Sequence, residues 1–294
     1  MAQHKAGFVN IIGNPNVGKS TLMNTLVGEK ISIITSKAQT TRHRIMGIVN
    51  GENYQIVYSD TPGLLKPAYK LQSSMMDFVH TALKDADVVL FVTDANDDAV
   101  PEEIFLNKLK TISCPIVLLI NKVDISNTQK VEGLADYWKA QLPKAEIIPA
   151  SALLNLNVNK LFERIVALLP ENPPYFDKDQ LTDKTERFFV AEIIREKVLL
   201  NYHREIPYST EVVVDEYLEG EALVKIRANI IVERESQKGI VIGHKGSMLK
   251  KVGTDARIDM EAFIGKKVFL QLFVKVDKDW RNNEGRLQSY GYKQ

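Results

Sequence analysis

The chain has 294 residues, of which 45% are hydrophobic and 26% are charged, and its formal net charge is +1. The length predicts about two domains, and this ordinary globular composition excludes a collagen, a disordered tail and a uniformly basic DNA-coating protein. The single cysteine, Cys114, cannot form an internal disulfide, which excludes a disulfide-stapled secreted fold and favours a reducing compartment.

No apolar run approaches the ~18 residues that a membrane span requires. The best runs, residues 88–92 and 116–120, have the length of strands. The apolar stretch near the N-terminus is interrupted at Asn10 and Gly13 and is too short for the core of a signal peptide. We therefore expect a cytoplasmic protein.

Up to about residue 170, short apolar runs alternate with stretches of helical spacing. The runs are residues 8–12, 56–58, 88–93, 116–121 and 147–150, and the helical stretches include 71–83, 102–109 and 158–169. Near-continuous apolar strands separated by helices predict the α/β class, with a mostly parallel sheet covered on both faces. Residues 45–49 and 54–58 are the exception, because the turn-forming pair Asn50 and Gly51 joins them into a hairpin that adds one antiparallel strand.

Prolines at 170, 173 and 174 end the last helix of this region, and the polar stretch 177–183 is typical of a linker. A helix, two strands, two helical stretches and a strand follow, at residues 186–201, 210–217, 223–233, 236–242, 247–264 and 267–276. This order predicts a smaller α+β domain. We expect a first domain over residues 1–172, a linker over 173–185, and a second domain with a C-terminal tail over 186–294.

A phosphate-binding motif lies between the first predicted strand and the next helix. Residues 13–20 match G-x-x-x-x-G-K-[ST], in which two glycines let the loop curl so that its N–H groups converge on phosphate oxygens. The lysine supplies charge to the β- and γ-phosphates, and the serine hydroxyl is a ligand for Mg²⁺. The residues predicted to hold the nucleotide here are Gly13, Asn14, Asn16, Val17, Gly18, Lys19, Ser20 and Thr21.

A second motif, Asp-Thr-Pro-Gly, occupies residues 60–63 at the end of a later strand. Asp60 can reach Mg²⁺ through water and the N–H of Gly63 can sense a γ-phosphate, with Thr61 between them; the alternative is a simple turn. In the polar segment before this strand, we favour Thr41 over Thr40 as a further Mg²⁺ ligand, which binds when a γ-phosphate orders the loop. Both threonines could instead cap the following strand.

The base-reading residues are predicted at the end of another strand. Asn121, Lys122 and Asp124 lie on the sheet edge where ligands bind in open α/β folds. Asp124 can accept two hydrogen bonds from the N1–H and the amine of guanine, a donor pair that adenine lacks. Asn121 can brace the loop or read the base, and the stem of Lys122 can cover the ring. After the next strand, Ser151 and Ala152 could offer an N–H to guanine O6.

Leu64 occupies the position where Ras-like GTPases carry a water-orienting glutamine, and leucine cannot form a hydrogen bond to water. We therefore predict slow intrinsic hydrolysis. Lys19, Thr41 and Gly63 are expected to act on the phosphates, and Asn16 is expected to help bind a monovalent cation such as K⁺ against them.

A second glycine loop lies in the predicted α+β domain. Gly243 and Gly246 form G-x-x-G between two helical stretches, and such a loop lets an RNA backbone approach without side-chain obstruction. Residues 238–294 are basic, with 12 Lys or Arg against 6 Asp or Glu. The alternative is a purely structural helix–helix turn. The predicted RNA contacts are Ile242, Gly243, His244, Lys245, Gly246, Leu249, Lys250 and Lys251, with Val252 also lining an apolar groove.

Together these motifs resemble the Era family of bacterial ribosome-assembly GTPases over nearly the whole chain. The resemblance also rests on Gln-Thr-Thr-Arg-His-Arg at residues 39–44, and on residues 239–253 within an element order similar to a type II KH domain. It implies a GTPase switch that uses GTP, GDP and Mg²⁺ and binds the 3′ end of 16S rRNA during maturation of the 30S subunit. The family is sometimes found peripherally at the inner membrane, and nothing in the sequence indicates an obligate oligomer, so we expect a monomer.

Two other functions stay open on the residues alone. A P-loop small-molecule kinase would share the phosphate loop but has no reason to carry a guanine reader at Asp124. An RNA-binding structural protein with a vestigial nucleotide site would keep its function without Lys19.

Overall fold

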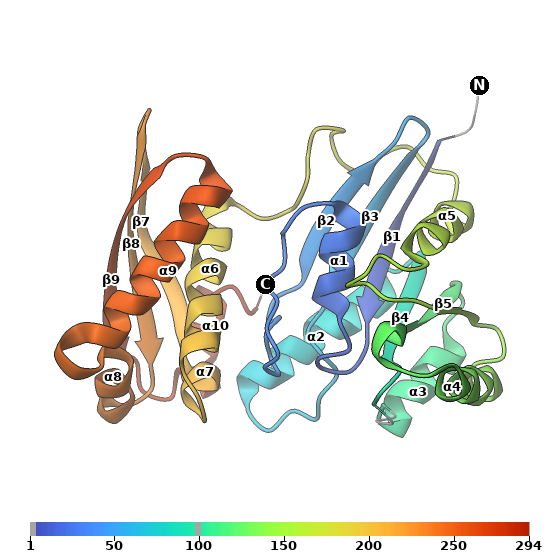
Figure 1. The fold of residues 1–294 in the computed structure, drawn as a ribbon, viewed down its shortest axis with the longest axis horizontal. Coiled ribbons are helices and arrows are strands. Elements are labelled where there is room, and N and C mark those ends of the chain that lie inside the picture. Colours follow the sequence, from blue (N-terminus) through green and yellow to red (C-terminus); the bar gives the residue numbers. More distant parts are fainter. Residues whose placement is uncertain (1–3, 98–100, 294) are drawn as a thin grey trace. The chain divides into compact units, whose positions relative to one another are not determined.

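The computed structural model describes residues 4–97 and 101–293 (Figure 1). Its described residues form two compact units: residues within 1–67 and 75–183 make the first, and residues 68–74 together with those within 184–294 make the second. Each unit has its own sheet and core, so each is described by itself.

The first unit is built on a six-stranded sheet with the order β2-β3-β1-β4-β5-β6. Only β2 runs antiparallel, paired with β3, and the other neighbours are parallel. This confirms the predicted parallel sheet with one antiparallel strand. The strands are β1 (Lys5–Ile12), β2 (Ile45–Asn50), β3 (Tyr54–Asp60), β4 (Val88–Asp94), β5 (Ile116–Asn121) and β6 (Glu146–Pro149).

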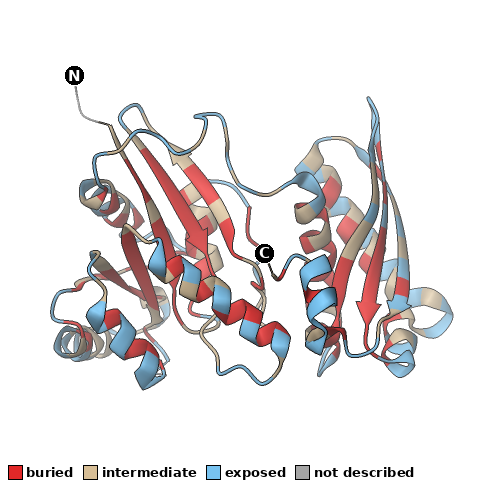
Figure 2. Ribbon diagram, turned by 180° about the vertical axis from the view of Figure 1, so that it is seen from behind, coloured by how far each residue is buried: buried red, intermediate tan, exposed pale blue. Residues whose placement is uncertain are grey.

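Helices connect these strands and bury their apolar runs. The helices are α1 (Lys19–Val27), α2 (Lys70–Lys84), α3 (Glu103–Thr111), α4 (Thr128–Gln141) and α5 (Val158–Leu168), with a short 3₁₀ turn η1 (Val123–Ile125). Residues 88–92 of β4 and 117–120 of β5 are fully buried, because both faces of these strands are covered (Figure 2). Strands buried on both faces consist of continuous apolar runs, as these do. Because parallel strands end at one edge, β1, β3 and β5 bring the loops after them together.

The stretch predicted as a linker is paired with the sheet. Ile48 N–H donates to the Leu181 carbonyl at 2.8 Å, and Thr182 Oγ1 donates to the Met46 carbonyl at 2.6 Å. Strand β2 is at the edge of the sheet and would otherwise leave backbone groups unpaired, so this polar segment covers that edge.

The second unit is a three-stranded sheet, order β7-β8-β9, with helices on one side (Figure 1). Strands β7 and β8 are antiparallel, whereas β9 runs parallel to β8. The main core residues come from α6, β8 and α9, including Ile194, Ile230 and Ala256. The elements are α6 (Glu186–Asn201), α7 (Ile206–Ser209), β7 (Glu211–Glu219), β8 (Leu223–Val232), α8 (Glu235–Ile242), η2 (His244–Gly246), α9 (Ser247–Ile264) and β9 (Lys267–Val276).

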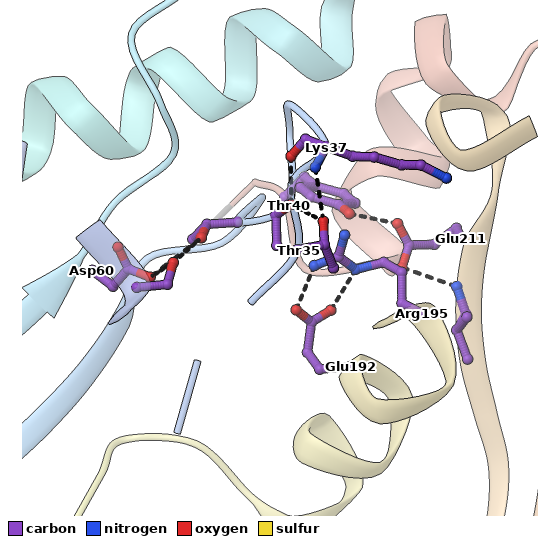
Figure 3. A network of polar contacts seen from close by, with 11 residues as sticks. Thr35, Lys37, Thr40, Asp60, Glu192, Arg195 and Glu211 are labelled. Atoms are coloured by element: carbon purple, nitrogen blue, oxygen red, sulfur yellow. Dashed lines mark hydrogen bonds and ion pairs between the residues drawn. The ribbon is translucent and has the colours of Figure 1, made fainter. Parts of the chain in front are cut away.

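The predicted C-terminal tail is folded into this unit as η3 (Trp280–Asn282) and α10 (Glu284–Ser289). Trp280 is fully buried, and its Nε1–H donates to the Ser209 carbonyl at 3.2 Å. The hydroxyl of Tyr292 donates to the Glu211 carboxylate, which also accepts from the Val212 N–H at 3.0 Å (Figure 3). The tail therefore closes one end of the core.

Residues 68–74 belong to the second unit although they follow the Asp-Thr-Pro-Gly motif closely. Lys70 donates its N–H to Asn282 Oδ1 at 3.3 Å, and its Nζ lies 3.1 Å from Glu284 Oε1. The Arg281 guanidinium lies 4.7 Å from the centroid of the Tyr69 ring. These interactions all lie within the second unit.

Candidate nucleotide site and nucleic-acid groove

The loop between β1 and α1 has the shape of a phosphate cradle because of two glycines. Gly18 has φ 95°, and a Cβ there would lie 2.3 Å from Asn121 Nδ2. A Cβ on Gly13 would lie 2.2 Å from the Val92 carbonyl oxygen. Asn16 is also left-handed, with φ 63°. Successive turns of this kind point backbone N–H groups into one concavity.

Lys19 is buried at the mouth of this loop, 6% exposed. Its Nζ donates to the carbonyl oxygens of Gly13 at 3.0 Å and Asn14 at 2.8 Å. Burial lowers the pKa of Lys19 to about 8, and the charge of Asp60 opposes that shift. The ammonium is therefore held in place by neutral oxygens that a phosphate could replace with charged ones.

Three oxygen ligands converge beside this lysine. Asp60 Oδ2 accepts from Ser20 Oγ at 2.7 Å and from Thr41 Oγ1 at 3.2 Å, and the two hydroxyls lie 3.0 Å apart (Figure 3). Burial raises the pKa of Asp60, and the charge of Lys19 opposes this. The other carboxylate oxygen, Asp60 Oδ1, is buried with no hydrogen-bond partner in the part of the chain that the structure describes. This oxygen-rich, under-satisfied cluster fits a hard cation such as Mg²⁺.

The two candidate threonines face different ways. Thr40 Oγ1 donates to the Lys37 carbonyl at 2.6 Å and lies 2.6 Å from Thr35 Oγ1, so its hydroxyl is used within its own loop (Figure 3). Thr41 instead turns to Ser20 and Asp60. The hydroxyl available to a metal at this place is that of Thr41.

A cavity of about 340 Å³ opens over the loop. Gly63 lines it and lies so close to the loop that a Cβ there would be 2.8 Å from Pro15 Cα. Thr61 does not face the cavity, since its hydroxyl donates to the Ile11 carbonyl at 2.7 Å and anchors β1. The lining residues are Pro15, Asn16, Gly18, Lys19, Ser20, Thr21, Ile33, Ile34, Thr35, Ser36, Lys37, Gln39, Thr40, Thr41, Gly63 and Lys122.

Asn121 braces the site. Its Nδ2 donates to the Val17 carbonyl at 2.8 Å, and its Oδ1 accepts from the Ala152 N–H at 2.9 Å. The N–H of Ser151 donates to the Leu156 carbonyl at 3.1 Å. Of the two roles open for Asn121, bracing is the one that its hydrogen bonds support. The N–H groups of Ser151 and Ala152 therefore both have acceptors within the protein, and their contact with guanine O6 stays a prediction.

Lys122 and Asp124 lie at the open side. Lys122 Nζ lies 2.6 Å from Asp94 Oδ2 and 2.7 Å from the Asn16 carbonyl oxygen, so its stem crosses from one loop to the other. Asp124 Oδ1 is buried without a hydrogen-bond partner among the described residues, so it could accept a hydrogen bond from a ligand. Sequence reasoning missed Asp94, although its place at the carboxyl end of β4 was a usable signal.

Leu64 lines a neighbouring cavity of about 460 Å³ together with Met76, Val79 and Phe105. Its N–H donates to the Gly13 carbonyl at 3.1 Å. The backbone at this position therefore positions the phosphate loop, and the side chain contributes no polar group.

In the second unit, the G-x-x-G segment makes a left-handed turn between α8 and α9. Gly243, Lys245 and Gly246 have φ of 73°, 49° and 78°. A Cβ on Gly243 would lie 2.7 Å from Met248 Cγ, whereas Gly246 faces open space. The first glycine is required by packing and the second leaves the approach to the loop unobstructed.

A groove of about 370 Å³ adjoins this loop. Leu249 lines it, as expected, and so does Lys250, while His244, Lys245 and Lys251 do not. Ile242 packs partly against the core, and the expectation for Val252 is wrong because helical phase turns it fully into the core. The lining residues are Gly246, Leu249, Lys250, Gly253, Thr254, Arg257, Leu270 and Leu272.

Sequence reasoning missed Arg257 and the two leucines of β9. The recurrence of lining residues at 246, 250, 253 and 257 follows the three- and four-residue spacing of one helix face, so Arg257 could have been found from α9 alone. Leu270 and Leu272 could not, because their contribution depends on β9 pairing parallel to β8.

Within the described parts of the chain, no helix combines the length and the apolar character needed to cross a membrane.

Comparison with known proteins identifies two family models. Residues 8–122 match the model described as 50S ribosome-binding GTPase, and residues 205–281 match the KH domain model. The chain is 47% identical to GTPase Era of Syntrophus aciditrophicus over 98% of this chain and 95% of that protein. It is 47% identical to GTPase Era of Geotalea daltonii over 99% and 98%.

Two solved structures match the whole fold with a TM-score of 0.94 and 41% identity, each covering 99% of this chain and 100% of the other. One is Era in complex with MgGDPNP and nucleotides 1506–1542 of 16S ribosomal RNA. The other is an Aquifex aeolicus Era variant bound to GDP·AlF₄⁻.

Proposed function

The chain belongs to the Era family of GTPases, and on that premise we propose that its GTP hydrolysis is coupled to binding of the 3′ end of 16S rRNA during maturation of the 30S subunit. The observation that carries the proposal is the pairing of two prepared sites in one chain. One is the nucleotide site, where Asp60 and Asp124 each keep a buried oxygen without a partner among the described residues; the other is the open loop at Gly246 beside its groove.

When a nucleotide binds, the N–H groups of the loop would donate to its phosphate oxygens, and Lys19 would exchange its two carbonyl acceptors for phosphate oxygens. Ser20 and Thr41 would hold Mg²⁺, with Asp60 acting through water; the ion supplies positive charge to the β- and γ-phosphates. Gly63 offers its N–H to the γ-phosphate, and Asp124 accepts from guanine. The hydrogen bonds of Lys19, Ser20, Thr41 and Asp60 support their assignments, and the partnerless oxygen of Asp124 supports its own.

Hydrolysis is proposed to be slow and to need K⁺. Leu64 offers no group that could orient the attacking water. Asn16 lines the cavity in a left-handed turn, and Lys122 binds its carbonyl, which places an amide side chain where a monovalent cation could meet the phosphates. Equal rates in potassium and sodium buffers would contradict this proposal.

In the second unit, the loop from Gly243 to Gly246 allows close approach of the RNA backbone. Leu249, Lys250 and the other groove residues contact the bases and phosphates of the RNA. Binding of GTP and RNA must favour each other to the same degree if they are coupled through binding affinity.

The test is GTPase activity with and without a single-stranded fragment of the 16S rRNA 3′ end. We expect the RNA to raise the hydrolysis rate or the affinity for GTP. A small-molecule kinase would be insensitive to RNA, and a vestigial nucleotide site would hydrolyse nothing in either condition. Following the family, we also propose that the chain works as a monomer in the cytoplasm, with any membrane contact peripheral.

A further inference from the structure

The outer face of the three-stranded sheet carries an unusual row of residues. Strand β9 alternates, with Leu270 and Leu272 turned to the helices and its other set of side chains turned away from them. Phe269 is 52% exposed and Phe273 is 48% exposed, although both are large and apolar. The outward row reads Lys267, Phe269, Gln271, Phe273 and Lys275.

The neighbouring strand adds positive charge to this row. Lys225 of β8 lies directly opposite Phe269 in the register, and Arg227 lies opposite Gln271. Neither β8 nor β9 contains an acidic residue. We name the outward residues Lys225, Arg227, Lys267, Phe269, Gln271, Phe273 and Lys275 the phenylalanine platform.

The lysine ion pairs of the platform are long and exposed. Lys275 lies 3.4 Å from Asp215 and Lys267 lies 3.4 Å from Glu261, with the two lysine side chains 59% and 78% exposed. Exposed ion pairs of this kind contribute little to stability. A phosphate can therefore replace the carboxylate partner of either lysine with little loss of free energy. Arg227 likewise forms only a long, exposed pair, 3.8 Å from Glu216 of β7, so the cations of the platform can still attract a polyanion.

The platform is continuous with the groove beside the glycine loop. Strand β9 pairs only with β8, so its second edge is free of strand partners in the described sheet. Leu270 and Leu272 line the groove on one side of this edge, and Phe269 and Phe273 stand on the other. A nucleic-acid strand that leaves the groove across β9 would come next to the platform.

We propose that the phenylalanine platform is a second binding surface for single-stranded RNA, on which Phe269 and Phe273 stack bases while the flanking lysines meet phosphates. The two rings are four residues apart on one face, about 13 Å at the usual rise of a strand, so they hold bases that are not adjacent. Stacking on aromatic side chains accepts every base, so this surface adds affinity without sequence preference. A protein partner fits less well, since protein interfaces are depleted in lysine.

This inference rests on the proposed RNA binding, and the experiment separates the two. The full-length chain is titrated with the last twelve nucleotides of 16S rRNA and with tetranucleotides tiled across them, using fluorescence anisotropy. The test variant is F269T/F273T, which replaces each ring with a β-branched residue that is favourable in a strand. The matched controls are Leu218→Thr on β7, which is 53% exposed, and F269Y/F273Y, which retains stacking.

We expect F269T/F273T to bind the twelve-nucleotide RNA about tenfold or more weakly and to bind the best tetranucleotide like the unchanged chain. Leu218→Thr and F269Y/F273Y should bind both RNAs normally. K267Q/K275Q should reduce the slope of log affinity against log salt by about 1.4, at roughly 0.7 for each phosphate that the variant no longer neutralises.

If F269T/F273T and the unchanged chain bound the longer RNA equally well, the proposed role of the platform would be wrong, whereas the proposed role of the groove would still stand. An equal loss for long and short RNA would also overturn the role of the platform, because the substitutions would then have damaged the groove. If sedimentation showed a dimer that F269T/F273T dissociates, with RNA binding unchanged, the face would belong to a second copy. If the unchanged chain bound neither RNA, both this inference and the proposed function would fall.

Discussion

At the scale of single residues, we propose that one side chain braces the nucleotide site and another binds the base. Asn121 uses both ends of its amide on the protein, on the Val17 carbonyl and the Ala152 N–H. Asp124 keeps a buried carboxylate oxygen without a partner within the described chain. A buried acceptor of this kind carries an energetic cost until a donor arrives, which gives a ligand with two donors an advantage.

Asp124→Asn is expected to change the base preference of the nucleotide site from guanine to xanthine. The amide cannot accept from both donors of guanine, and loss of two hydrogen bonds to a charged group, at about 1.5 to 3 kcal/mol each, predicts at least a hundredfold loss of GTP affinity. Xanthosine triphosphate should gain affinity. Nucleotide competition binding measures both, with the exposed Asp136→Asn of α4 as the control; unchanged GTP affinity would end the base-reading assignment.

The lowered pKa of Lys19 predicts that nucleotide binding depends on pH. Because burial lowers its pKa from 10.5 to about 8, the nucleotide-free protein loses this charge as the pH rises through 8. Phosphates favour the charged form, so binding must then take up a proton. GTP affinity should be constant below about pH 7 and fall by up to tenfold per pH unit above 8. Calorimetry across this range should find the fall in the unchanged chain and not in Lys19→Ala.

At the scale of elements, spacing and turn residues predicted most of the molecule. Apolar runs predicted β4 and β5 because strands buried on both faces need no polar residues. The pair Asn50 and Gly51 predicted the β2–β3 hairpin, whose turn closes with Gly51 N–H donating to the Tyr54 carbonyl at 2.9 Å. The parallel pairing of β9 was beyond sequence reasoning, since it depends on where α8 and α9 return the chain.

Two short segments could not be predicted from the sequence. The segment that covers β2 is polar, and its pairing depends on the edge that it meets rather than on its own residues. The short helix α10 has six residues and buries little besides Leu287, so it has no detectable period. Its position is instead fixed by Trp280 and Tyr292 on either side.

Trp280→Ala should destabilise the second unit. Trp280 is fully buried against the carbonyl of Ser209, and removal of a buried tryptophan side chain costs about 3 to 5 kcal/mol. Urea unfolding followed by circular dichroism measures the loss. Lys278→Ala, two residues earlier, should unfold like the unchanged chain, and an equally small effect at Trp280 would mean that the C-terminal segment is not part of the core.

Gly246→Asp should weaken RNA binding and spare GTP. The site is left-handed, with φ 78°, and its face is open, so the carboxylate would stand where an RNA backbone approaches. We expect at least a tenfold loss of affinity for single-stranded RNA from charge repulsion and strain. Gly239→Asp places the same charge on α8 outside the loop and is the control. Loss of GTP binding together with RNA binding would indicate an unfolded protein.

At the scale of the whole molecule, the boundaries of the two units differ from the domain boundaries that the sequence predicts. The stretch at 177–183 completes the first sheet, whereas residues 68–74 cluster with the second unit. The nucleotide motifs were predictable because each one lies at the end of a strand, and parallel strands end at one edge. The side-chain partners of Asp60 and Asn121 required the three-dimensional structure, since they come from segments up to about a hundred residues away.

The most direct measurement is a crystal structure of the chain with a non-hydrolysable GTP analogue and Mg²⁺. We expect phosphates within residues 13–20, a magnesium ion on the hydroxyls of Ser20 and Thr41, and guanine bound by the Asp124 carboxylate. An analogue bound elsewhere, with residues 13–20 empty and Asp124 still without a partner, would contradict it.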